Sequence, residues 1–168
     1  MIQTIVHMNN KAQHLQRDQF IIKSFKELSQ LLPSIVNSKG LSTGNLRFSI
    51  LFRCTGSLEN DVAMCTQEFQ NTKAVLKDEF STTAKSGMFF NPEIGTIFCL
   101  GNLSSMFLQE INGQALGAIG TGVYGIIRGL GINDEEAKQH VTHLSKDHYL
   151  LFVSGKTATI EKLKQTIK

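Results

Sequence analysis

The stretch from Gly113 to Gly131, GQALGAIGTGVYGIIRGLG, places the strongest constraint on how this chain folds. It holds seven of the fourteen glycines in the sequence, and its small residues recur every four positions beside aliphatic residues at helical spacing. A glycine inside a helix costs roughly 0.5–1 kcal/mol relative to alanine, so such a helix needs the close approach of a second backbone. The pattern predicts a glycine zipper, a helix whose face of small residues packs tightly against a neighbour. These small residues are Gly113, Gly117, Thr121, Gly125 and Gly129.

The preceding residues extend this prediction to a helical hairpin over residues 101–131. Residues 103–111 suit a first helix, and a corner is expected at Glu110, Asn112 and Gly113. The sequence leaves three partners open for the zipper, namely the same chain, a second copy or lipid.

The position of Arg128 favours a second copy of the chain as the partner of the zipper. Gln114, Thr121 and Arg128 recur every seven residues and form a polar line beside the glycines. If the zipper packs between subunits, Arg128 is placed to reach across a twofold interface. We therefore expect a homodimer.

Composition and charge bound the class of protein. The 168 residues fit one domain over residues 1–168. A net charge of +3, no tryptophan and no basic run interleaved with aromatic residues argue against a nucleic-acid partner. Cys54, Cys65 and Cys99 are odd in number and form no C-x-x-C pair, so we expect reduced thiols that fill the core of a cytoplasmic protein. The first residues also lack the pattern of a signal peptide.

Hydrophobic patterns along the chain predict strands that alternate with helices, and therefore an α+β domain with helices packed on a sheet. Strands are expected at residues 2–8, 46–53, 94–100 and 148–153, the second with one face in the core. Helices are expected over 12–32, kinked or ended by Pro33, over 57–76 with a break near Asn71, over 134–146, and from Thr157 onward. Residues 37–45 and 81–92 are expected to be loops. The expected N-caps are Ser57, Asn133 and Thr157, with Glu136 completing a capping box.

Residues 91–154 resemble the small bacterial general stress proteins of the heat-induced type. The matching residues are Pro92 to Gly95, Gly101 to Leu103, Gly113 to Gly129, Gly131, Ile132, Asp134 to Ala137 and Leu150 to Val153. The chain departs from the family pattern at Asn133, His140 and Asp147-His148, where proline, tyrosine and a glycine pair are usual. The resemblance implies a ferredoxin-like or related α+β sheet with a glycine-zipper hairpin, in a cytoplasmic protein without established catalytic residues.

Two glycine motifs are similar to nucleotide-binding patterns but lack their context. Gly120, Gly122 and Gly125 form G-x-G-x-x-G without a convincing strand before them or an acidic residue after the next strand. Residues 155–157 read Gly-Lys-Thr after a predicted strand, but Leu150 stands where a phosphate-binding loop has its first glycine. We therefore expect no nucleotide cofactor.

Histidines provide the remaining candidate for chemistry. Glu136, His140 and His143 share one face of a predicted helix, and His148 follows shortly after. Imidazoles and a carboxylate are zinc ligands, but a stable site needs further ligands and supporting contacts, and a solvated helix face is the alternative. The same group could form a pH-sensitive contact. No Ser-His-Asp or Cys-His arrangement is recognisable, so we expect no enzyme.

The sequence therefore favours a non-enzymatic cytoplasmic protein, stress-associated by resemblance, that acts through protein contacts or self-association of the glycine-rich helix. Two alternatives stay open. The uncharged window 111–127 is short for a membrane span, which needs about twenty apolar residues, but it suits association with a membrane surface. Residues 136–148 suit a metal-binding or small-molecule-binding domain.

Overall fold

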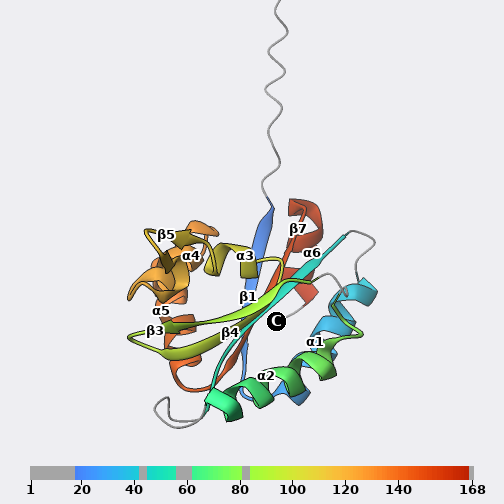
Figure 1. Cartoon of the computed structure of the whole chain (residues 1–168). Coiled ribbons are helices and arrows are strands. Elements are labelled where there is room, and N and C mark those ends of the chain that lie inside the picture. Colours follow the sequence, from blue (N-terminus) through green and yellow to red (C-terminus); the bar gives the residue numbers. More distant parts are fainter. Residues whose placement is uncertain (1–17, 42–44, 56–61, 81–83, 167–168) are drawn as a thin grey trace, which may run out of the picture.

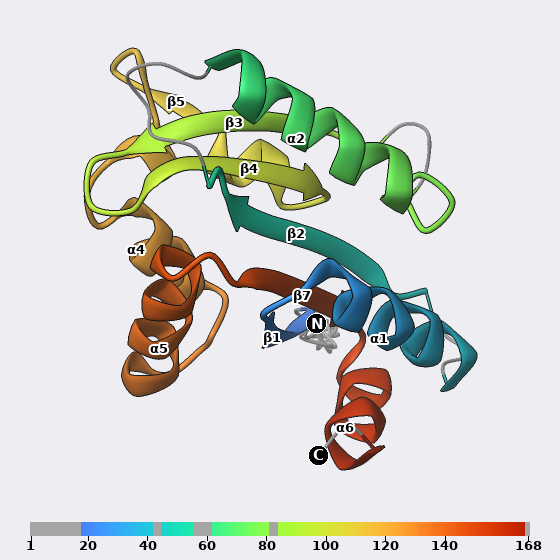
Figure 2. The same ribbon diagram turned by 90° about the horizontal axis from the view of Figure 1, so that it is seen from below.

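Five strands form one antiparallel sheet in the order β1-β7-β2-β4-β3, with helices on both faces (Figures 1 and 2). The computed structural model describes residues 18–41, 45–55, 62–80 and 84–166. The elements are β1 (Gln19–Phe25), α1 (Leu28–Leu41), β2 (Arg47–Arg53), α2 (Val62–Leu76), β3 (Ser86–Asn91), β4 (Gly95–Gly101), α3 (Ser104–Phe107), β5 (Glu110–Ile111), β6 (Gln114–Ala115), η1 (Leu116–Ala118), α4 (Gly122–Gly129), α5 (Asp134–Ser145), β7 (Tyr149–Gly155) and α6 (Thr157–Thr166). The predicted α+β class is confirmed.

Two helical connections set the strand order. α1 links β1 to β2, and β7 pairs antiparallel with both of these strands. α2 links β2 to β3, and β4 pairs antiparallel with both. Strands that a helix links are therefore parallel and lie two positions apart. Right-handed connections that step in one direction across a sheet place both helices on the same face, as Figure 1 shows for α1 and α2.

The sheet is buried on both faces. Side chains of α1, α2 and α6 pack on one face around Phe52 and Phe98. Those of α3, α4 and α5 pack on the other face around Phe107 and Phe152. The inner strands β2, β4 and β7 therefore carry nearly continuous runs of buried residues. The strand predicted at residues 46–53 is confirmed as β2, but the expectation that only one of its faces is buried was wrong.

Several further predictions hold. The apolar runs at 94–100 and 148–153 form β4 and β7, and the last two helices form α5 and α6. Asn133 caps α5, because its Oδ1 accepts a hydrogen bond of 2.9 Å from the backbone N–H of Glu136.

The helix predicted over residues 12–32 is confirmed only over residues 28–32, at its C-terminal end, and is wrong for residues 19–25. Residues 19–25 form β1, which pairs with β7 along its whole length, and the helix begins only at Leu28. Pro33 lies inside α1 and does not end it. The complete burial of Leu31 and Ile35 against the sheet offsets the hydrogen bond that a proline removes.

The two predicted loops are shorter than expected. α1 continues to Leu41, and β3 occupies much of the segment 81–92. α2 runs without a break through Asn71, whose side chain accepts a hydrogen bond of 2.9 Å from Gln67. The strand expected at residues 2–8 and the cap expected at Ser57 lie outside the described residues.

A disulfide joins Cys54, just after β2, to Cys65 in α2. Both residues are buried, and the bond closes a loop with a sequence separation of 11. A crosslink over a loop of this size stabilises a fold by about 3 kcal/mol in the chain-entropy model. The expectation of three reduced cysteines was therefore wrong. The argument for a reducing compartment rested on those thiols, so it no longer holds. Cys99 is a free, buried thiol in the core, as expected.

The glycine-rich stretch does not form the predicted helical hairpin. Residues 110–115 form a small β-hairpin, with Asn112 and Gly113 in its turn at φ angles of 53° and 79°. η1 follows, and α4 begins only at Gly122. No helix in the described ranges has the length and apolar character that crossing a bilayer requires.

Asn91, at the end of β3, holds the middle of this stretch in place. Its fully buried amide donates hydrogen bonds to the carbonyl oxygens of Gly117 and Ile119, each at 2.9 Å, and to that of Gly120 at 3.3 Å. Its Oδ1 accepts from two backbone N–H groups of the following turn. One side chain therefore replaces the backbone hydrogen bonds that a continuous helix would have supplied.

Candidate functional site

The residues predicted for a glycine zipper do not come together on one face. Gly113 lies in the hairpin turn, and Gly117 packs beneath the ring of Phe89, where an added Cβ would lie 2.7 Å from ring atoms. Gly125 and Gly129 are exposed on α4, with no described atom within 4 Å of an added Cβ. The zipper therefore fails as a packing device within the chain.

The polar members of that set have local roles. Thr121 is exposed and precedes α4. The Arg128 guanidinium donates a hydrogen bond of 2.9 Å to the carbonyl oxygen of Ile132, which links the end of α4 to the loop before α5. Arg128 is thus engaged within its own chain.

The structure does bring the predicted histidines together, but around a serine. Ser24 Oγ on β1 lies 3.1 Å from His140 Nδ1 and 2.9 Å from His143 Nδ1 on α5. The rings of His143 and His148 stack with centroids 4.9 Å apart. A hydroxyl has one proton, so at least one of the two imidazoles that contact Ser24 must donate its Nδ1–H to the serine oxygen.

These side chains do not form the predicted metal site. No group of three histidine, cysteine, aspartate or glutamate side chains within the described ranges is arranged to hold a metal ion. Two Nδ1 atoms are directed to Ser24, and Glu136 is exposed on α5. The arrangement is a hydrogen-bonded contact between an edge strand and a helix.

Burial, and after it the charge of neighbouring groups, lowers the pKa of two histidines in this cluster. Burial lowers the pKa of His140, and the charge of His143 lowers it further, against a smaller opposing effect of Glu136. Burial also lowers the pKa of His148, followed by the charges of His143, Lys26 and Lys146, while Asp147 opposes them. Both histidines therefore remain neutral in the folded protein at pH values where they are protonated in the unfolded chain.

We expect the free energy of unfolding to fall as the pH is lowered from about 7 to 5. The unfolded chain takes up protons near the ordinary histidine pKa of about 6.5, whereas the folded protein takes them up only at lower pH. The contribution is complete above the unfolded pKa and is lost as the pH falls through the folded pKa. Urea unfolding at several pH values should show a flatter dependence for the double variant His140→Gln, His148→Gln. Equal slopes for the two proteins would contradict the assignment.

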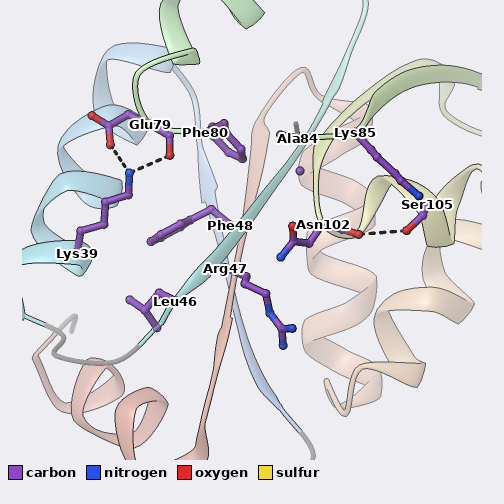
Figure 3. A pocket seen from close by; sticks show the side chains of 11 residues that line it. Lys39, Leu46, Arg47, Phe48, Glu79, Phe80, Ala84, Lys85, Asn102 and Ser105 are labelled. Atoms are coloured by element: carbon purple, nitrogen blue, oxygen red, sulfur yellow. Dashed lines mark hydrogen bonds and ion pairs between the residues drawn. The ribbon is translucent and has the colours of Figure 1, made fainter. Parts of the chain in front are cut away.

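A cleft that the sequence did not indicate lies at one end of the sheet (Figure 3). It has a volume of about 490 Å³ and lies between α1, the start of β2, residues 79–80 after α2, residues 84–85 before β3, and the end of β4 with α3. Its lining residues are Lys39, Leu46, Arg47, Phe48, Glu79, Phe80, Ala84, Lys85, Gly101, Asn102 and Ser105. These residues come from separate segments of the chain, so no local motif could have revealed them.

Two ion pairs shape the cleft. Lys39 Nζ lies 2.7 Å from Glu79 Oε2 and 2.8 Å from the Glu79 carbonyl oxygen, and it stands 5.7 Å above the centre of the Phe48 ring. Arg47 pairs with Asp18. Each of these two cations therefore has a carboxylate beside it.

Gly101, which lines the cleft, allows two backbone segments to approach closely. Its φ of 105° is rare for other residues, and a Cβ there would collide with the carbonyl oxygen of Phe48 and lie 2.8 Å from Ser49 Cα. Its N–H donates a hydrogen bond of 2.8 Å to the carbonyl oxygen of Lys85. This contact fixes the segment that carries Lys85 against the end of β4.

Cys99 is not suited to act as a nucleophile. Burial raises the pKa of Cys99 to about 11, so the thiol stays protonated at neutral pH.

Comparison with protein-family models, with curated proteins and with solved structures gives no match, so the resemblance to the general stress proteins stays a prediction from the sequence.

Proposed function

We propose that this protein is a non-catalytic binding protein that associates with a second copy of itself through the edge strand β3. The proposal keeps the expected homodimer but moves its interface from the glycine-rich segment to the edge of the sheet. The observation that carries it is an uncharged edge strand with exposed apolar side chains.

Strand β3 has the properties of a pairing edge. It is the last strand in the sheet order, its sequence SGMFFN has no charge or proline, and Met88 and Phe90 are 43% and 50% exposed. Gly101 N–H donates a hydrogen bond to the Lys85 carbonyl oxygen. The backbone N–H and C=O groups of Lys85 and of the odd-numbered residues of β3 therefore point toward β4. The N–H and C=O groups of Ser86, Met88 and Phe90 consequently point away from the sheet, where another strand can pair with them.

The opposite edge of the sheet is protected by charge. β1 carries Lys23 in its middle, with Asp18 and Lys26 at its two ends. Natural proteins use charged residues on edge strands to prevent unwanted pairing. β3 lacks this protection.

A second copy of the same strand is a suitable partner, because β3 is self-complementary. An antiparallel pairing centred on Phe89 places Met88 of each copy opposite Phe90 of the other on the same face.

The test replaces Phe90 with lysine and measures mass in solution by light scattering coupled to size-exclusion chromatography. We expect a dimer for the unaltered protein and a monomer for Phe90→Lys, because two cations would face the partner's apolar strand. Val36→Lys, at a residue of α1 that is 52% exposed, is the control and should stay dimeric. A monomeric parent protein, or a Phe90→Lys variant that stays dimeric, would overturn the proposal.

The resemblance adds two finer elements to the proposal. The unit β1-α1-β2, with β7 between its strands, supports a sheet related to the ferredoxin-like type. A role in the stress response is what the resemblance implies for the dimer.

A further inference from the structure

We infer that the cleft in Figure 3 is a binding site for a small organic anion with a flat apolar body. Its volume of about 490 Å³ lies within the range of about 300–1,000 Å³ that is usual for small-molecule sites. The inference concerns a different surface from the β3 edge and does not depend on the dimer.

The two sides of the cleft differ in character. Leu46, Phe48 and Phe80 lie on one side in Figure 3, and Lys85, Asn102 and Ser105 lie on the other. The Phe48 ring is mostly buried, and Lys39, which lies above it, pairs with Glu79. A planar apolar group is suited to the space beside two aromatic rings.

The charge of the cleft selects an anion. The carboxylate of Glu79 is already paired with Lys39, and Arg47 is paired with Asp18. Among the described residues, Lys85 has no ion-pair partner, and Figure 3 shows its ammonium group directed toward Ser105. The cleft therefore has one uncompensated positive charge.

Neutral donors stand beside that charge. The Asn102 amide and the Ser105 hydroxyl line the same side, and within the described part of the chain the serine hydroxyl donates one long hydrogen bond of 3.3 Å, to the Asn102 carbonyl oxygen. A carboxylate, sulfonate or phosphate has enough acceptor sites to bind the ammonium, the amide and the hydroxyl together. A cationic ligand would meet Lys85 without a free carboxylate to offset it.

The test uses 8-anilinonaphthalene-1-sulfonate, an aromatic sulfonate whose fluorescence rises on binding, and the full chain. We expect saturable binding at one site per chain, weakened about tenfold by Lys85→Gln, because the variant loses a charge-assisted hydrogen bond to the sulfonate. Phe80→Ala should weaken binding as well. Lys162→Gln, an exposed lysine on α6 outside the cleft, is the matched control and should leave binding unchanged.

A neutral analogue separates the charge from the apolar body. N-Phenyl-1-naphthylamine has the same aromatic groups without the sulfonate, so we expect it to bind more weakly and to be insensitive to Lys85→Gln. Lack of saturable sulfonate binding would overturn the inference. So would equal affinity for Lys85→Gln and the unaltered protein, or loss of the site in Phe90→Lys, which would place the probe on the β3 edge.

Discussion

Replacing Asn91 with aspartate should destabilise the protein by about 3 kcal/mol or more, because an uncompensated buried charge has a cost of that size. The change keeps the shape of the side chain and the oxygen that accepts from the turn after β3. It removes the NH₂ group that binds the carbonyl oxygens of Gly117, Ile119 and Gly120. A carboxylate oxygen would then face three carbonyl oxygens at a fully buried position.

The destabilisation by Asn91→Asp should depend on pH. Burial and the facing carbonyl groups should raise the pKa of the new carboxyl above its unfolded value, so the protonated form is the one that folds well. A raised pKa makes the variant lose stability as the pH rises through the folded pKa. The difference in unfolding free energy between the variant and the parent should therefore be smaller at pH 4–5 than at pH 7, as measured by urea unfolding.

A matched control distinguishes burial from the chemical change. Asn37→Asp makes the same replacement at an exposed position of α1. We expect an effect within about 0.5 kcal/mol, as for other surface substitutions. If Asn91→Asp were equally mild, the amide of Asn91 would not hold the glycine-rich segment.

Sequence patterns that reflect burial predicted secondary structure most reliably. Two strands, β4 and β7, appeared as short, nearly continuous apolar runs, and the asparagine that caps α5 was recognisable in the sequence. In these cases the local pattern and the tertiary environment favour the same structure. The alternation in β2 found the strand but not its second buried face, because Ser49 is polar and buried, and its hydroxyl accepts a hydrogen bond from Leu103 N–H.

Edge strands were harder to predict. β1 and β3 pair on one side only, and their residues are mostly half-buried or exposed, so periodicity was weak. For residues 19–25, apolar spacing that suits a helix was outweighed by pairing with β7. The cleft was beyond local patterns altogether, since its walls come from distant segments. Ser24 likewise lies 116 residues from the histidine His140 that it contacts.

The helical hairpin predicted for the glycine-rich segment was wrong for a different reason. Its four-residue spacing suggested one helix, yet the Asn112-Gly113 pair is a strong signal for a hairpin turn, because both residues tolerate positive φ. That local signal outweighs a periodicity based on glycines, which favour no single structure. Within Gly113–Gly131, α4 covers eight residues, and η1 adds a 3-10 turn of three residues.

Replacing Gly122 with alanine should destabilise the protein by about 3 kcal/mol, because overpacking by a methyl group that only backbone movement can relieve reaches this size. The new Cβ would collide with the carbonyl oxygen of Leu116 and would lie 3.0 Å from its carbonyl carbon and 3.3 Å from Gly117 Cα. All three atoms belong to the backbone of η1, which Asn91 and Phe89 hold from the other side. No side-chain rotation can therefore make room.

Gly125→Ala, three residues further along the same helix, should have the opposite sign. No described atom lies within 4 Å of an added Cβ there, and the residue is exposed, so alanine should stabilise α4 by about 0.5–1 kcal/mol. Thermal unfolding of the two variants separates two explanations for the glycines. If they served a helix interface with another chain, Gly125→Ala would weaken assembly, whereas a tight turn between η1 and α4 makes only Gly122 indispensable. A stable Gly122→Ala variant with a dissociated Gly125→Ala variant would favour the zipper over the turn.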